Sequence, residues 1–403
     1  MTDEKKRGRV TWTLRYTILN AAYFSAFCTL HAYAAVYLLA KGMTNTQVGI
    51  LLAVSNILSA VLQPVIAGII DKPGFLTNKL FIIISVIVIM IGSAVLLVIP
   101  DSIAVIFVVY ALIYTVQFVY QPVLTALCFE YQKKGCDIVY GLARGLGSTG
   151  FAITSLFIGS AVEKNGVSIL LWMNIAVMII SLAAILTFRA DDPGDDAISE
   201  DNTAHKAHNS FSSFAKTYPA FMPFLIGTIC FFFGHNMIND FMIVIIRNLG
   251  GGETQLGYAT FLQAILELPV MAAIGIVLKK FSADKLLIFS GMAFFAKILI
   301  LMFATNMIGL YASQSFQMFA YAVFIPAGAY YVSTTMEELD QVKGQAYITS
   351  AITVGGVFSN LISGVILDNS GIFMMLLTGT VVCGVGVLIA FFAMRNRRKP
   401  LSD

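Results

Sequence analysis

A single arginine lies within the apolar stretch from Tyr140 to Gly166, which reads YGLARGLGSTGFAITSLFIGSAVEKNG. An arginine in hydrocarbon costs at least about 2.5–3.5 kcal/mol, so Arg144 should face a polar interior and have a partner. Phe151 follows seven residues later, on the same helical face and about 10 Å further along the axis. A cation and an aromatic ring on one face can hold a hydroxyl-rich ligand, so we predict that both bind substrate. The alternative is an arginine that extends to the cytoplasmic interface.

A second polar set follows in four consecutive apolar stretches of the C-terminal half. The candidate substrate-binding residues in this set are Asn236, Lys297 and Gln317. Asn236 lies one helical turn before Asp240, so the two side chains share a polar stripe. Polar groups at this depth on neighbouring helices predict the wall of a wet cavity.

Glu267 is the best candidate for carrying a proton. It lies near the middle of its apolar stretch, two residues before Pro269, where a carboxylate is costly unless it is paired or protonated. Lys297 is its expected counter-ion, and a structural ion pair is the alternative. Asp240 is the second candidate for proton coupling, although an extracellular gate or a pair with Arg247 would also explain it.

Three residues near the cytoplasmic ends of predicted helices are candidates for gating. Asp71 and Lys72 follow the second apolar stretch directly, and Asp71 could pair with a helix end or a basic residue in one conformation. Glu130 ends the fourth stretch and could reach Arg144. A carboxylate that simply extends to the membrane surface is the alternative for Glu130.

The composition determines the class of protein that must position these residues. Hydrophobic residues make up 58% of the 403 residues and charged residues only 12%, whereas soluble domains carry about 25% charge. The sequence therefore predicts an all-α polytopic membrane protein. A soluble enzyme is excluded, and no nucleophile–base set, metal-ligand set or phosphate-binding loop indicates catalysis, a metal or a cofactor.

Apolar stretches long enough to span a bilayer can be counted along the chain. We predict twelve transmembrane helices, near residues 14–39, 47–70, 79–100, 102–130, 139–162, 167–188, 219–246, 254–279, 284–304, 306–335, 344–367 and 371–394.

Charge predicts the orientation of these helices. With both termini in the cytoplasm, only Lys41, Lys164 and Arg247 of the 25 basic residues fall in segments on the outer side, as the positive-inside rule requires. In this orientation the acidic stretch over 191–217 lies in the cytoplasm. Because it has no apolar periodicity, we predict that it is a flexible linker. We therefore predict a six-helix bundle over residues 1–190, a linker over 191–217 and a second bundle over 218–403.

The two predicted bundles repeat short motifs in the same order. The sequence TQVG from Thr46 corresponds to TQLG from Thr254, and Glu163 corresponds to Asp368 within a shared pattern of glycines. Two six-helix halves in parallel orientation indicate the major facilitator architecture, with a substrate site between the halves near the midplane.

Several motifs resemble a known family at this point. The segment GIIDK from Gly68 resembles the loop motif of the major facilitator superfamily. More narrowly, YGLARGLGSTGFA resembles the fifth-helix motif of the lactose-permease-like oligosaccharide:proton symporters, as GYATFLQAILELPVM and AKILILMFATN resemble their eighth and ninth helices. The resemblance implies that Arg144 and Phe151 hold a sugar, and it places Lys297 where that family has an arginine.

The chain departs from that family in two places. Its tenth predicted helix reads SFQMFAYAV, with Gln317 and Ala320 where the family has a histidine and a proton-carrying glutamate. The fourth-helix carboxylate that pairs with the arginine is also missing unless Glu130, about one turn later, substitutes for it.

These observations predict a secondary transporter of the cytoplasmic membrane that moves a small polar solute, a sugar or a nucleoside, by proton symport with alternating access. The alternative is a proton-driven exporter of drugs or metabolites, because one fold serves both directions. A receptor or scaffold would need a further folded domain. The expected partners are the solute, a coupling ion and the lipid bilayer, with no nucleic acid, and we expect a monomer.

Overall fold

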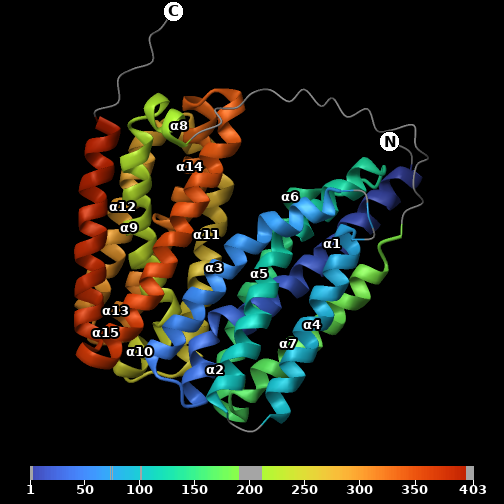
Figure 1. The fold of residues 1–403 in the computed structure, drawn as a ribbon, viewed down its shortest axis with the longest axis horizontal. Helices are drawn as coiled ribbons and strands as arrows, with labels where there is room; N and C mark the ends of the chain where they lie inside the picture. The colour runs from blue at the N-terminus through green and yellow to red at the C-terminus, as the bar shows by residue number, and fades with distance from the viewer. Residues whose placement is uncertain (1–2, 73, 75, 100–101, 190–210, 396–403) are drawn as a thin grey trace, which may run out of the picture. The chain divides into compact units, whose positions relative to one another are not determined.

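The protein is helical throughout the part of the chain that the computed structural model describes (Figure 1). The described residues are 3–72, 74, 76–99, 102–189 and 211–395. Most of the predicted linker, residues 191–210, lies outside them. In hydrocarbon a backbone must satisfy its own hydrogen bonds, so long apolar stretches fold as helices.

Contacts between Cα atoms divide the chain into two compact units. Unit 1 comprises Met1–Met43, Val54–Asp201 and Gly252–Phe261, and unit 2 comprises Thr44–Ala53, Asn202–Gly251 and Leu262–Asp403. The linker-based boundaries at 190 and 217 describe chain order and stay a prediction.

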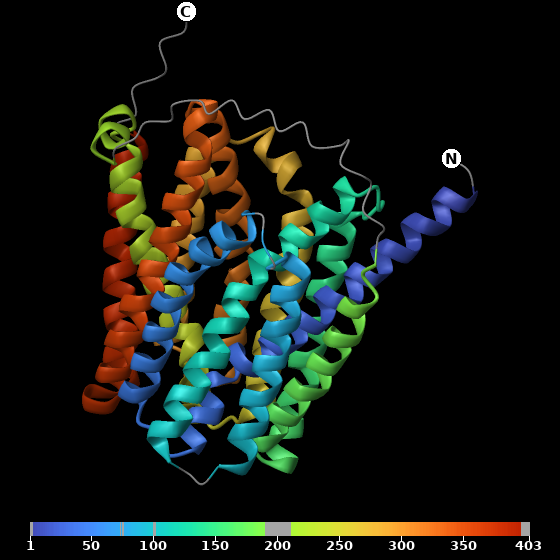
Figure 2. The ribbon, with the colours of Figure 1, turned by 45° about the vertical axis from the view of Figure 1, so that its right-hand side comes forward.

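Unit 1 is built mainly from the first seven α-helices. They are α1 (Asp3–Phe27), α2 (Ala34–Ala40), α3 (Asn45–Ile70), α4 (Asn78–Val98), α5 (Ile103–Lys133), α6 (Tyr140–Asn165) and α7 (Ser168–Leu186). A π-helical turn, η1 (Cys28–Ala32), separates α1 from α2. Helix α4 packs against α5 and α7, and α1 packs against α6 and α7 (Figure 2).

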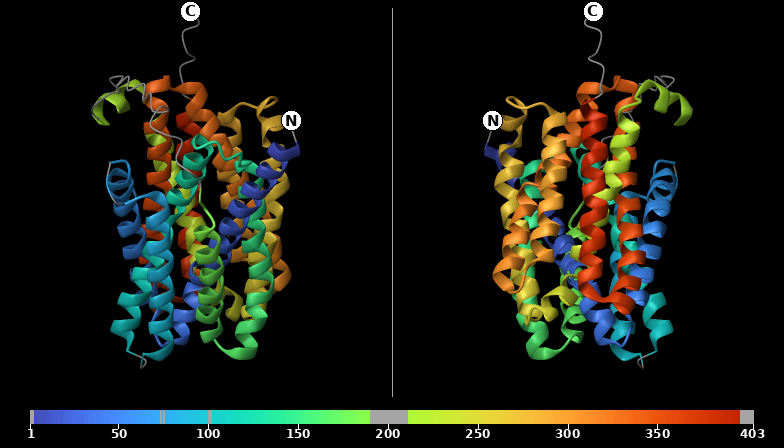
Figure 3. Two further views of the ribbon diagram at one scale, coloured as in Figure 1. Left: turned by 90° about the vertical axis from the view of Figure 1, so that its right-hand side faces the viewer. Right: turned by 90° about the vertical axis from the view of Figure 1, so that its left-hand side faces the viewer.

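Unit 2 is built mainly from the later helices. They are α8 (Phe211–Thr217), α9 (Phe221–Asp240), α10 (Met242–Asn248), α11 (Glu253–Leu278), α12 (Ala283–Met302), α13 (Met307–Ser315), α14 (Tyr321–Thr335) and α15 (Glu338–Arg395). Helix α9 packs beside the end of α15, which is drawn in red in Figure 3. The two helices are close here, because a Cβ on Gly227 of α9 would lie 3.1 Å from the backbone oxygen of Gly386 on α15.

Nine helices of the described residues are long and apolar enough to cross a membrane, or ten if α1 and α2 are taken as one bent span. The predicted count of twelve is therefore not confirmed. Part of the difference comes from α15, whose 58 residues include non-helical backbone at Gly371 (φ 80°, ψ −177°). Another part comes from the stretch 307–335, where the 3₁₀ turn η3 (Phe316–Met318) separates two shorter helices.

Matching carboxylates cap the start of one helix in each unit. In unit 1, Glu163 at the end of α6 accepts hydrogen bonds from the backbone N–H (2.9 Å) and hydroxyl (2.7 Å) of Thr254. In unit 2, Asp368 on α15 accepts the corresponding bonds from Thr46 at 2.7 and 2.6 Å. Each carboxylate satisfies a free N–H group at a helix start. The motifs that repeat in sequence therefore make equivalent contacts.

Candidate functional site

The predicted cation of unit 1 lies over an aromatic ring. The guanidinium carbon of Arg144 is 4.2 Å from the ring centroid of Phe24 on α1, and its Nη1 donates a hydrogen bond to the hydroxyl of Ser148 at 3.3 Å. A cation–π contact of this kind contributes about 0.5–2 kcal/mol. All three side chains are half-buried. The ring that partners Arg144 is therefore Phe24, which the sequence did not single out.

Phe151 extends this arrangement along an aromatic strip on α1. Its ring centroid is 6.4 Å from that of Phe27, and Phe27 stacks on His31 with centroids 4.1 Å apart. Phe24, Phe27 and His31 share one face because they are three and four residues apart. Within unit 1, Arg144 and Phe151 are thus both adjacent to the same strip.

His31 lies in the π-helical turn between α1 and α2 and is buried among rings. The Tyr114 ring centroid is 3.8 Å away and the Phe118 centroid 4.4 Å away. Short π-helical segments occur often at functional sites. Neither ring nitrogen of His31, and neither side-chain atom of the buried Gln117, has a hydrogen-bond partner among the described residues. The polar residues in this apolar stretch were the only sequence signal for this cluster.

A buried amide bridge joins the predicted acid and base of unit 2. Lys297, which is 0% exposed, donates a hydrogen bond from Nζ to Oε1 of Gln317 at 2.8 Å. Gln317 in turn donates from Nε2 to Oε1 of Glu267 at 2.8 Å. A direct ion pair between Lys297 and Glu267 was predicted, but their contact runs through the neutral amide of Gln317. The described residues contain no salt bridge between the two.

The break in the helix at η3 makes this bridge possible. Gln317 is the middle residue of the 3₁₀ turn, and the hydroxyl of Ser290 donates to the backbone oxygen of Ala320 just beyond it at 2.7 Å. On the other side of the turn, the hydroxyl of Ser313 donates to the backbone oxygen of Lys297 at 2.7 Å. The turn is therefore anchored on α12, which carries the lysine.

A chain of polar side chains lies one turn away on α11. The amide nitrogen of Gln263 donates to Oδ1 of Asn239 at 3.2 Å and to the amide oxygen of Gln314. The amide of Asn239 is 2.9 Å from Nε2 of His235. Gln263 precedes Glu267 by four residues, so both side chains share a helical face. That spacing was the signal for Gln263, which the sequence analysis did not name.

Asn236 and Asp240 lie on α9 outside this chain. The amide nitrogen of Asn236 donates to the backbone oxygen of Phe232 at 2.9 Å, one turn earlier in the same helix. Asp240 is the last residue of α9 and makes no salt bridge with a described residue, so the pair with Arg247 that the sequence suggested is not present. The side-chain amide of Asn360 lies against the Asp240 carboxylate but does not meet hydrogen-bond geometry.

The structure shows what surrounds the three candidate gating residues. Asp71 and Lys72 are exposed at the end of α3, without side-chain hydrogen bonds to other described residues. Glu130 forms a salt bridge with Lys134 at 3.2 Å and accepts a hydrogen bond from the amide of Asn78 at 2.9 Å. The predicted contact between Glu130 and the arginine of α6 is thus replaced by these two.

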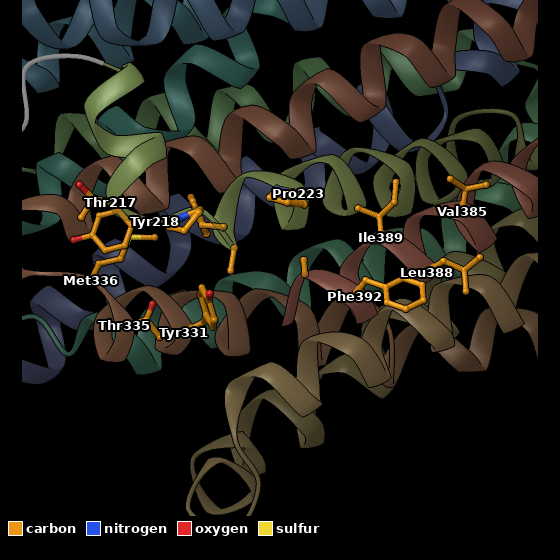
Figure 4. Close-up of a pocket in the computed structure, with 14 residues that line it drawn as sticks. Thr217, Tyr218, Pro223, Tyr331, Thr335, Met336, Val385, Leu388, Ile389 and Phe392 are labelled. Carbon is orange, nitrogen blue, oxygen red and sulfur yellow. The ribbon is translucent and has the colours of Figure 1, made fainter. Parts of the chain in front are cut away.

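A pocket of about 990 Å³ opens elsewhere in unit 2. Tyr218 marks one end and Val385 the other (Figure 4). Apolar side chains from α9 and α15 form half of its lining, and none of the predicted site residues contributes to it. Size alone therefore does not identify the solute site, which we seek among the polar clusters described above.

Comparison with known proteins establishes the family. A model of the MFS_1-like family matches residues 13–377. The fold is similar to that of the nucleoside transporter NupG, with a TM-score of 0.79, 14% identity, and coverage of 96% of this chain and 100% of that one.

The fold is also similar to that of an auto-inhibited POT-family peptide transporter (TM-score 0.73, 11% identity, coverage 98% and 99%). A bacterial homologue of the human lysosomal transporter Spinster matches with a TM-score of 0.68, 13% identity and coverage of 99% and 100%. No curated protein sequence matches this chain.

Proposed function

Because the chain belongs to the MFS_1-like family of major facilitator transporters, we propose that it is a proton symporter of a nucleoside-type solute. The family and the fold make it a multi-pass membrane protein and a secondary transporter rather than an enzyme. The solute, the coupling ion and the direction of transport are parts of the proposal.

The bridge from Lys297 through Gln317 to Glu267 is the observation that carries the proposal of proton coupling. A proton carrier needs an acid that can exist in both charge states. A direct salt bridge would favour the ionised state alone. The neutral amide of Gln317 donates from Nε2 to Oε1 of Glu267, and either a carboxylate or the carbonyl oxygen of a protonated acid can accept that bond. Lys297 and Gln317 thus support either state, and Asp240 remains the second candidate.

The surroundings of Arg144 support a solute with both hydroxyl groups and a flat ring. Its guanidinium has five N–H donors, of which one is bound to Ser148, so others can bind hydroxyl oxygens. The half-buried rings of Phe27 and Phe151 offer faces for stacking. A nucleoside uses both features, with its ribose hydroxyls on the arginine and its base against a ring. The solved nucleoside transporter of the same fold is consistent with this choice.

Unit 2 offers further groups for binding such a solute. Asn236, Gln317 and Lys297 are the residues that the sequence selects, and Gln263 and Asn239 add amide donors and acceptors. We further propose that both termini are cytoplasmic, that the protein acts in the cytoplasmic membrane as a monomer, and that Asp71, Lys72 and Glu130 take part in gating.

Uptake into proteoliposomes tests the proposal. Labelled uridine, adenosine, lactose and glucose are presented separately, with and without an imposed inward proton gradient. We expect one of the nucleosides to accumulate above its external concentration only when the gradient is present, with collapse by a protonophore. Accumulation of a sugar instead would overturn the solute class. Gradient-driven loss of preloaded solute would identify the exporter alternative.

A further inference from the structure

Three polar side chains on α15 are buried without hydrogen-bond partners. Ser359, Asn360 and Ser363 are each 0% exposed. Both serine hydroxyls and both polar atoms of the asparagine amide lack a partner among the described residues. Each such atom costs about 1–3 kcal/mol when it stays unpaired, and a helical serine usually bonds to a carbonyl one turn back. Four unpaired polar atoms within five residues therefore indicate that the helix binds something here.

A carboxyl group that forms no salt bridge with a described residue lies beside these atoms. The carboxylate of Asp240 is in contact with the amide of Asn360, and no basic side chain among the described residues forms a salt bridge with it. Asp240 is also the last residue of the 20-residue helix α9, where the helix dipole is negative. Carboxylate and helix end therefore both favour a positive ion at this point.

Close packing of α9 on α15 brings the groups together. A Cβ on Gly355 would lie 2.6 Å from the backbone oxygen of Ile229, and one on Gly356 would lie 3.0 Å from the amide nitrogen of Asn236. Gly356 and Asn360 are one turn apart on α15, as Asn236 and Asp240 are on α9. The two pairs therefore face each other along the line of contact.

We propose that Asp240, Asn360, Ser359 and Ser363 bind a sodium ion at the end of α9. A hard cation prefers oxygen ligands, and these residues supply a carboxylate, an amide oxygen and two hydroxyls. Ends of broken helices bind Na⁺ in other transporters, and α9 is broken from α10 at Phe241. One carboxylate balances one positive charge, which favours a monovalent ion. A proton on Asp240 could pair only with the amide oxygen of Asn360 and would leave both serine hydroxyls unpaired.

Thermal unfolding of the purified protein in detergent tests this site. The unfolding midpoint is measured in NaCl from 0 to about 200 mM, and KCl replaces the missing NaCl so that the ionic strength stays constant. An ion that binds only the folded protein raises this midpoint. We expect Na⁺, and not K⁺, to raise the midpoint. Asp240→Asn should abolish the response, and Ser363→Ala should raise the half-effect concentration at least about tenfold, which is about 1.4 kcal/mol.

The control variant is Glu267→Gln, which should keep the full sodium response because its carboxylate belongs to a different cluster. An equal effect of Na⁺ and K⁺, or a wild-type response in Asp240→Asn, would overturn the proposal. If Asp240→Asn does not fold, the sodium responses of Ser359→Ala and Ser363→Ala test the proposal instead. An unchanged half-effect concentration of Na⁺ in both variants would overturn the proposal. This measurement needs no solute. The sodium site can therefore be refuted while nucleoside uptake is confirmed, and nucleoside uptake can be refuted while the sodium site is confirmed.

Discussion

Replacement of Arg144 by alanine should weaken solute binding without unfolding the protein. The side chain is half-buried, and its contacts among the described residues are a cation–π contact with Phe24 and one hydrogen bond to Ser148. Its loss should therefore cost little stability. A hydrogen bond from a charged donor to a ligand contributes about 1.5–3 kcal/mol. Because about 1.4 kcal/mol corresponds to a factor of ten, Arg144→Ala should raise the Kd about 10- to 150-fold.

Equilibrium binding of a labelled nucleoside to purified protein measures this effect, and thermal unfolding monitors the fold. Arg144→Lys keeps the charge but not the planar fork of donors, so it should recover only part of the affinity. Ser148→Ala is the matched control on the same helix, since it removes a local hydrogen bond and leaves the cation in place. A Kd within twofold of wild type in Arg144→Ala, with normal stability, would refute a ligand-binding role and leave a purely structural one.

Three further predictions test other parts of the account. Gln317→Leu should lower the thermal midpoint, because buried Lys297 loses the acceptor at 2.8 Å and an unpaired buried group costs about 1–3 kcal/mol or more when charged; a midpoint equal to wild type would argue against the bridge. Asp71→Asn should slow transport with little change in Kd, measured by uptake and equilibrium binding, and a large loss of affinity with normal exchange would contradict gating. Gly159→Ala should destabilise the protein by about 1–3 kcal/mol, since its Cβ would overlap the backbone oxygen of Glu253 in α11. Gly145→Ala, whose Cβ would meet nothing within 4 Å, should not lower stability in the same unfolding assay.

The course of the chain through the membrane could be predicted largely from sequence. Long apolar stretches can only be helices in lipid, and α3, α6 and α11 begin within two residues of the predicted positions. The break at η3 could not be predicted in this way, because hydropathy does not distinguish a 3₁₀ turn from a continuous helix. Hydropathy predicted two helices over 344–367 and 371–394, and in α15 the non-helical backbone of Gly371 separates two helical segments at that point.

The sequence selected candidate site residues more readily than it predicted which residues on other helices they contact. Spacing along α6 placed Arg144 and Phe151 on one face, but it could not show that Phe24, on another helix, supplies the ring over the arginine. Likewise, charge alone suggested a direct pair between Glu267 and Lys297. The position of Gln317 between them depends on how α11, α12 and η3 pack, which no pattern within a single helix reveals.

The central claim is that Glu267 couples a proton gradient to solute movement, and one pair of assays on Glu267→Gln tests it most directly. Gradient-driven accumulation and solute exchange at equal pH are measured in the same proteoliposomes. The amide cannot take up and release a proton, yet it keeps a hydrogen-bond acceptor for Gln317. We therefore predict that Glu267→Gln loses accumulation and retains exchange. Accumulation at the wild-type level in response to the proton gradient would contradict the claim and move coupling to Asp240 or another ion.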